Sequence, residues 1–305
     1  MNTFAMQLND PIVRQLLWCI TGAELAHMDT VESLNIPLDV HLKDWFMALD
    51  QQPTPLHLFL EQTNNKRLGA YFECLWQFFL SHYPDWQLNA NNLQIIEEKK
   101  TLGELDILAV DAQGAGYHLE LAVKFYLQHP DHSGQESRHW LGPQSIDKLD
   151  KKLLTLRNKQ FPILHHPRTQ KALLELNIPL PTRQRLILKG YLFHHWQKEF
   201  LLPNEANEKC LMGEWLHQKD IKKLTANHEH WLLVLKPLWL GTVKHALTPN
   251  DDAILNADQA NKTVQKHFLN PANKHALMLI KVAAQPDYFV ESRRYLIVND
   301  AWPNT

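Results

Sequence analysis

Hydrophobic residues recur along the chain with two different periods, and the first part of the sequence is dominated by the helical one. Within residues 1–60, apolar side chains at helical spacing from Val13 to Ile20 predict one of several short helices separated by proline-containing turns. Residues 67–82, RLGAYFECLWQFFLSH, are apolar on almost every side and end before Pro84, which disfavours helical geometry in the residue ahead of it. We therefore expect a buried helix at 67–82 behind an N-terminal helical layer.

After this helix the hydrophobic period changes to two, which predicts β-strands. Residues 92–100, 103–111 and 116–127 alternate in this way, and the sequence AQGAG between the last two is typical of a hairpin turn. An amphipathic helix at 144–160 and another strand at 185–196 follow. The predicted order is therefore helix, three antiparallel strands, helix, strand.

The last hundred residues mix the two periods. Residues 230–241, 274–284 and 293–300 have the pattern of strands, whereas residues 251–269 have that of a helix. These patterns favour an α/β protein with a helical N-terminal extension, a central core and a C-terminal α/β lobe of unknown role. We place these three parts at residues 1–60, 61–200 and 201–305.

Composition limits the classes of function. A hydrophobic content of 45% is enough for a sizeable core, and 31 basic against 33 acidic side chains give a formal net charge of −2. Any polyanion must therefore be bound by a local patch. Three widely separated cysteines indicate free thiols in a reducing compartment. Because we find neither a signal peptide nor a membrane span, we expect a cytoplasmic protein without a membrane partner.

The 18 histidines do not form a recognisable metal motif. The pairs His165–His166 and His194–His195 are adjacent, so their rings point to opposite faces in a strand, and no cysteine lies at ligand spacing. We interpret these histidines as structural or surface residues rather than as zinc or haem ligands.

Two consecutive strands of the predicted hairpin carry charged residues near their middles. Alternation puts Glu104 and Asp106 on one face of the first strand, and Glu120 and Lys124 on one face of the second. Bringing Asp106 and Glu120 together costs Coulomb repulsion, which a divalent cation with oxygen ligands relieves. The acids can share a face only if the turn contains an odd number of unpaired residues or a bulge.

A helical acid, a G-x-x-D strand, and an acid followed by a lysine on the next strand resemble the PD-(D/E)XK nuclease superfamily, whose fold is restriction-endonuclease-like. The strings LGELDILAV, HLELAVKFYL and LGPQSIDKLDKKL more closely resemble an uncharacterised bacterial family, domain of unknown function 1853, placed in that superfamily. The resemblance implies a Mg²⁺- or Mn²⁺-dependent hydrolase that cuts phosphodiester bonds in DNA or RNA. It implies that Glu73 is the helical acid, that Asp106 and Glu120 bind the metal, and that Lys124 is the catalytic lysine.

The sequence departs from the superfamily pattern at the lysine. That pattern sets the acid and the lysine two residues apart, whereas Glu120 and Lys124 are four apart with Ala122 between them on the same face. Two additional residues move the ammonium by about 6.5 Å along a strand. Glu104 is then a candidate partner for Lys124 or an additional metal ligand.

Alternative interpretations remain at the sequence level. The charged residues of the hairpin could form an exposed ladder in which each cross-strand pair contributes about 0.2 to 1 kcal/mol. The protein could also be an inactive relative that binds nucleic acid or a protein partner. Lys148, Lys151 and Lys152 of the second helix are candidates for binding nucleic acid, against the alternative of an ordinary solvated helix face.

Overall fold

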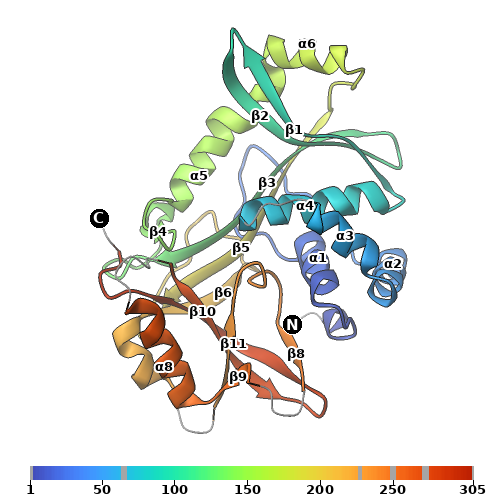
Figure 1. The fold of residues 1–305 in the computed structure, drawn as a ribbon. Coiled ribbons are helices and arrows are strands. Elements are labelled where there is room, and N and C mark those ends of the chain that lie inside the picture. The colour runs from blue at the N-terminus through green and yellow to red at the C-terminus, as the bar shows by residue number, and fades with distance from the viewer. Residues whose placement is uncertain (1–2, 63–66, 226–228, 248–251, 270–274, 304–305) are drawn as a thin grey trace.

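A single mixed sheet runs through the computed structural model, which describes residues 3–62, 67–225, 229–247, 252–269 and 275–303 (Figure 1). Its strands follow the order β1-β2-β3-β5-β6-β11-β10-β7-β9, with β4 beside β3 and β8 beside β11. The strands are β1 (Trp86–Glu97), β2 (Lys100–Asp111), β3 (Gly116–Gln128), β4 (Trp140–Leu141), β5 (Arg183–His195), β6 (Leu211–His217), β7 (His230–Val234), β8 (Lys244–Ala246), β9 (Ile254–Leu255), β10 (Leu277–Ala284) and β11 (Tyr288–Val298). The helices are α1 (Pro11–Thr21), α2 (Val40–Gln51), α3 (Thr54–Glu61), α4 (Leu68–His82), α5 (Leu149–Thr155), α6 (Pro167–Glu175), α7 (Ile221–Leu224) and α8 (Ala257–Phe268).

The predicted mixed α/β class is confirmed, as are the three antiparallel strands. β1, β2 and β3 pair antiparallel, and β5 then lies parallel to β3. The expected helix at 144–160 is shorter than predicted, because α5 ends at Thr155 and continues as a π-helical turn, Leu156–Gln160. Strand β6 and helix α6 had no counterpart in the sequence prediction.

The C-terminal elements differ in length from the prediction. The segment 230–241 contains a strand only as far as Val234, and the predicted helix 251–269 begins at Ala257 after the short strand β9. Asp251 and Lys274, at the edges of two predicted elements, lie outside the described residues. The sheet continues across residue 200 through the pairing of β5 with β6, and the three-part division remains a prediction.

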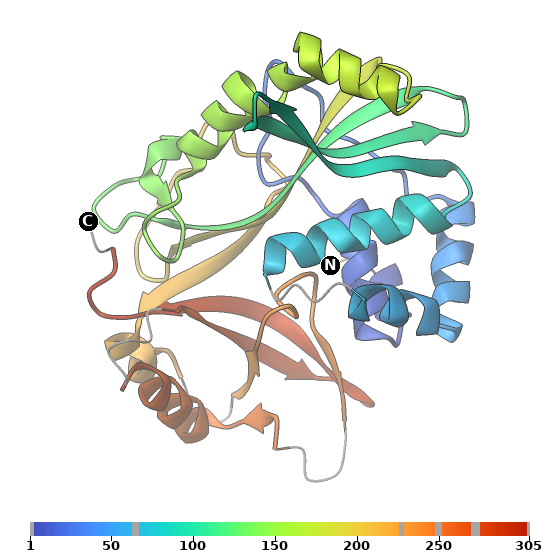
Figure 2. The same cartoon turned by 45° about the horizontal axis from the view of Figure 1, so that its top comes forward.

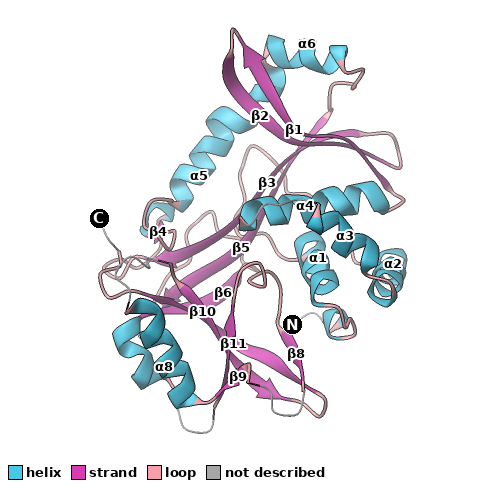
Figure 3. Ribbon diagram, in the orientation of Figure 1, coloured by secondary structure: helices cyan, strands magenta, loops and turns pink. Residues whose placement is uncertain are grey.

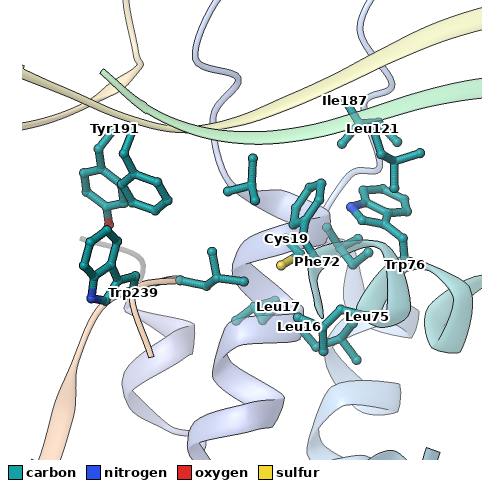
Figure 4. Close-up of a cluster of buried hydrophobic side chains, with 14 of the residues drawn as sticks. Leu16, Leu17, Cys19, Phe72, Leu75, Trp76, Leu121, Ile187, Tyr191 and Trp239 are labelled. Carbon is teal, nitrogen blue, oxygen red and sulfur yellow. The ribbon is translucent and has the colours of Figure 1, made fainter. Parts of the chain in front are cut away.

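The N-terminal helices α1 to α4 form a layer on one face of β3 and β5 (Figures 1 and 2). Odd-numbered residues of β3, from Leu119 to Leu127, join the large apolar core on this face. In Figure 4, Leu121 and Ile187 point from the two strands toward Trp76 of α4. Trp76 is 1% exposed, so α4 is buried as its composition predicts.

The opposite face of the same strands is covered by α5, whereas α8 packs farther along the sheet (Figure 3). Ala122 and Tyr126 of β3 pack with the apolar residues of α5. The two faces of β3 therefore bury side chains of opposite parity. Any even-numbered polar residue of β3 must lie under or beside α5. No helix among the described residues is long and apolar enough to cross a membrane.

Gly190 allows β5 to approach β3 next to Lys124. Its φ is +143°, and a Cβ atom there would lie 1.7 Å from the backbone oxygen of Lys124. Both the backbone conformation and the close contact therefore require glycine.

We predict that Gly190→Ala lowers the free energy of unfolding by at least about 2 kcal/mol, because the strands must move apart. Gly69→Ala is the matched control, since a Cβ at Gly69 in α4 meets nothing within 4 Å. Urea denaturation measures both variants. Equal stability of Gly190→Ala and the wild type would contradict this explanation.

Candidate active site

The β2–β3 hairpin sets Asp106 opposite Glu120. Three unpaired residues, 112–114, form its loop, which is closed by the hydrogen bond from Asp111 N to Ala115 O (3.1 Å). Because this number is odd, Asp106 and Glu120 lie on the same face of the sheet, which is necessary for the two side chains to meet. The ladder includes Ile107 opposite Leu119, and Asp106 and Glu120 are the next residues in that register.

At this point the two strands separate, and the Asp106 carboxylate takes the place of a backbone acceptor. The amide of Leu121 donates to Asp106 Oδ2 at 2.9 Å. Asp106 therefore lies in the fork between β2 and β3, where it is only partly exposed. Glu120 projects from β3 and is 0% exposed. The two carboxyl groups lie near enough for the charge of Glu120 to act on Asp106.

Glu120 is held by two neutral side chains. His118 Nε2 lies 2.9 Å from Glu120 Oε1, and Gln160 Nε2 donates to Glu120 Oε2 at 2.5 Å. Burial lowers the pKa of His118 to about 4, so the ring is neutral at pH 7 and its contact with Glu120 is a hydrogen bond rather than an ion pair. Gln184 Nε2 lies 3.0 Å from the other ring nitrogen, which orients the imidazole.

Burial raises the pKa values of both central carboxyl groups. The pKa of Asp106 rises to about 7, first because of burial and then because of the charge of Glu120. Burial raises the pKa of Glu120 to about 8, against the attraction of Lys152. The pair therefore retains a proton near neutral pH, which a bound cation would displace.

Lys152 is the lysine whose charge acts on both carboxyl groups. Burial and the nearby charge of Lys124 lower its pKa, whereas Glu120 and Asp106 act in the opposite direction. Its ammonium donates to Gln160 Oε1 at 2.9 Å, so Gln160 connects the lysine to Glu120. Gln160 occupies the π-helical turn after α5, and turns of this kind often occur at functional sites.

Lys124 lies farther along β3 and has a different partner. Its ammonium forms an ion pair with Asp147 at 2.6 Å, with side chains that are 32% and 39% exposed. The four-residue spacing has thus placed Lys124 near Asp147, in the loop before α5. Its role as the catalytic lysine stays a prediction.

Glu73 and Glu104 border the same cluster. Asn92 Nδ2 lies 3.3 Å from Glu73 Oε2 and 3.3 Å from Glu104 Oε1, so Asn92 of β1 connects α4 to β2. Burial raises the pKa of Glu73, and the charges of Asp106 and Glu104 raise it further. Both acids therefore lie within electrostatic reach of Asp106.

The donor set suits a hard divalent cation better than zinc. In the described part of the chain, no group of three or more His, Cys, Asp or Glu side chains is arranged so that it could hold a metal ion. Mg²⁺ needs fewer protein ligands, because it keeps several waters and is commonly held by one or two carboxylates. Two adjacent buried carboxyl groups with raised pKa values meet that requirement.

Tertiary structure separates the lysines that the sequence grouped together. Lys151 is exposed, Lys148 is partly buried just before α5, and Lys152 is connected to Glu120 through Gln160. The position of Lys152 had a sequence signal, because it follows Leu149 by three residues and therefore flanks the apolar face of the helix. The contribution of Gln160 had no sequence signal, since it depends on the π-helical turn.

A family model described as “Domain of unknown function (DUF1853)” matches residues 7–298. No curated protein and no solved structure matches the chain. The closer resemblance drawn from the sequence strings is thereby confirmed. Because the family description states no activity, function must be inferred from the side chains themselves.

The raised pKa values predict how stability depends on pH. The folded protein keeps protons on Asp106 and Glu120 that the unfolded chain has already lost above about pH 4. Their contribution to stability is therefore complete at low pH and is lost as the pH rises through about 7 and 8. We predict that the metal-free protein loses stability progressively from about pH 4 to about pH 8 and little beyond that.

Urea denaturation across this range checks the prediction. The double variant Asp106→Asn/Glu120→Gln should show a flatter dependence on pH, because neither amide titrates. An unchanged slope in the double variant would mean that other groups cause the loss.

Proposed function

The chain belongs to the DUF1853 family, and we propose that it is a metal-dependent nuclease of the PD-(D/E)XK type that hydrolyses phosphodiester bonds in nucleic acid. The observation that carries this proposal is the buried pair Asp106 and Glu120, with the ammonium of Lys152 nearby. The order α4, β1 to β3, α5, β5 supports a restriction-endonuclease-like core. In it, three antiparallel strands lie between two helices and a parallel strand follows.

Asp106 and Glu120 would hold Mg²⁺ or Mn²⁺, and Glu73 and Glu104 would add negative charge around the ion. When bound, such an ion lowers the pKa of a coordinated water and stabilises charge on a phosphodiester oxygen. The fork between β2 and β3 orients Asp106, because Leu121 N occupies one oxygen of its carboxylate. The rest of that carboxylate remains available to a ligand.

Lys152 is the best candidate for stabilising negative charge on the phosphate. It comes from α5, on the side of the sheet that Glu120 faces, and Gln160 fixes its ammonium. His118 stays neutral and keeps Glu120 in one orientation. Positive charge is thus supplied without an ion pair that would neutralise Glu120 completely.

An inactive protein that binds nucleic acid or a protein partner is the second candidate. The ion pair between Lys124 and Asp147 favours it, because the lysine at the motif position is already engaged. The lack of a three-ligand group in the described ranges also fits an inactive site. The two candidate functions differ in what they predict for the wild type, since only the nuclease must bind metal and cleave nucleic acid.

We predict that the purified protein cleaves DNA or RNA in millimolar Mg²⁺ or Mn²⁺ and that Asp106→Asn lowers the rate at least about 100-fold. The asparagine oxygen can still accept from Leu121 N, so the variant should fold. Lys152→Met should lower kcat by about 100-fold, whereas Lys262→Met, which changes an exposed lysine of α8, should leave it unchanged. A gel assay with labelled oligonucleotides measures each rate, and equal activity of Asp106→Asn and the wild type would indicate a contaminant.

Metal binding can be measured without turnover. We predict that millimolar Mn²⁺ raises the Tm of the wild type by a few degrees near pH 8, since the ion binds the folded state only. Asp106→Asn should show no such shift, because it removes one of the two charged ligands. A wild-type Tm that does not respond to Mn²⁺ would favour the inactive alternative.

A further inference from the structure

A crevice of about 410 Å³ lies along the edge of β3 beyond the carboxylate pair. We call it the Lys236 crevice. Its lining includes Lys124, Gln144, Ile146, Asp147, Lys236 and Trp239. It is exposed to solvent, and its size falls within the range of small-ligand sites.

The Lys236 crevice adjoins the candidate active site. Lys124, which lines it, follows Glu120 by four residues on β3, a distance of about 13 Å along a strand. Leu68 lines it from the start of α4, five residues before Glu73, or about 7.5 Å along a helix. Figures 1 and 2 show α4 and α5 on either side of β3.

The charges in the crevice favour an anion. Lys124 is paired with Asp147, but the ammonium of Lys236 lies over the ring of Trp239, 4.8 Å from its centre. Among the described residues, no carboxylate pairs with Lys236. Two ammonium groups therefore face one carboxylate, and Lys236 can bind a phosphate without first breaking an ion pair.

The wall that carries Lys236 is held in place by buried hydrogen bonds. Trp239 Nε1 donates to Val234 O at 2.8 Å, and Arg294 Nη1 donates to Trp239 O at 2.6 Å. Arg294 is itself buried and bound by Glu291 at 2.7 and 2.8 Å. The crevice is thus formed before a ligand arrives, which lowers the entropic cost of binding.

Apart from Gln144 and His275, most of the remaining lining is apolar, and it reaches the surface. Ile146 lies in the loop before α5 and is 80% exposed. Leu68 and Phe125 also line the crevice. A nucleobase can pack on such side chains once it has left a base stack. A paired and stacked base cannot enter a pocket of this kind without being extruded from the duplex, at a cost of a few kcal/mol.

We propose that the Lys236 crevice binds one unpaired nucleotide of the substrate strand, with phosphate on Lys236 and Lys124 and the base against Ile146 and its apolar neighbours. This rests on the proposed nuclease function and narrows its substrate to single strands, or to strands that open locally. Binding there would hold the strand beside Asp106 and Glu120.

The test is equilibrium binding in EDTA, measured by the fluorescence anisotropy of a labelled 12-nucleotide single strand and of the corresponding duplex. The wild type should bind the single strand at least about 10-fold more tightly than the duplex. Lys236→Ala should weaken single-strand binding several-fold and reduce the salt dependence by about one phosphate contact. Ile146→Ala should weaken it by about 2- to 5-fold through the lost apolar contact.

Matched controls lie elsewhere on the surface. Lys262→Ala in α8 and Leu174→Ala in α6 also remove exposed side chains, and neither should change binding. Three results would each overturn the crevice proposal. They are no binding by the wild type, equal binding of single strand and duplex, and wild-type affinity in Lys236→Ala. The nuclease proposal would then still be decided by metal-dependent cleavage and its loss in Asp106→Asn, which is measured separately.

Discussion

The burial of two carboxyl groups side by side, at the fork where β2 leaves β3, is the constraint on which the site depends. Ionising both Asp106 and Glu120 there is unfavourable, since they lack water and repel each other. A protein can relieve this by keeping a proton on the pair or by binding a cation. Neutral His118 and the amide of Gln160 hydrogen-bond to Glu120. The single ammonium group of Lys152 attracts both carboxylates but does not neutralise the charge of the pair.

The hairpin itself could be predicted from the sequence. Alternation gave the two strands, their faces and the requirement for an odd turn, because each is a local property of the backbone. Asp106 and Glu120 therefore came together as expected from their positions. The helix 67–82 was equally clear, since an apolar segment that long must be buried in a folded chain.

The lysine could not be predicted in the same way. Sequence spacing pointed to Lys124 because it shares a strand face with Glu120, but the strand carries it toward Asp147. Lys152 of α5 is connected to Glu120 through Gln160, and this connection depends on how α5 packs and on the π-helical turn that positions Gln160. The spacing from Leu149 indicates the side of the helix on which Lys152 lies, but the packing of α5 and its π-helical turn have no short-range pattern. The same is true of the Lys236 crevice, whose walls come from segments more than a hundred residues apart.

We expect Asp106 and Glu120 to exchange a shared proton for a divalent cation. Titration calorimetry with Mn²⁺ at pH 7.5, repeated in buffers of different ionisation enthalpy, tests it most directly. We predict one binding event that releases roughly one proton in the wild type and is absent in the Asp106→Asn/Glu120→Gln variant. Mn²⁺ binding of equal strength in both proteins, or binding without proton release, would contradict it.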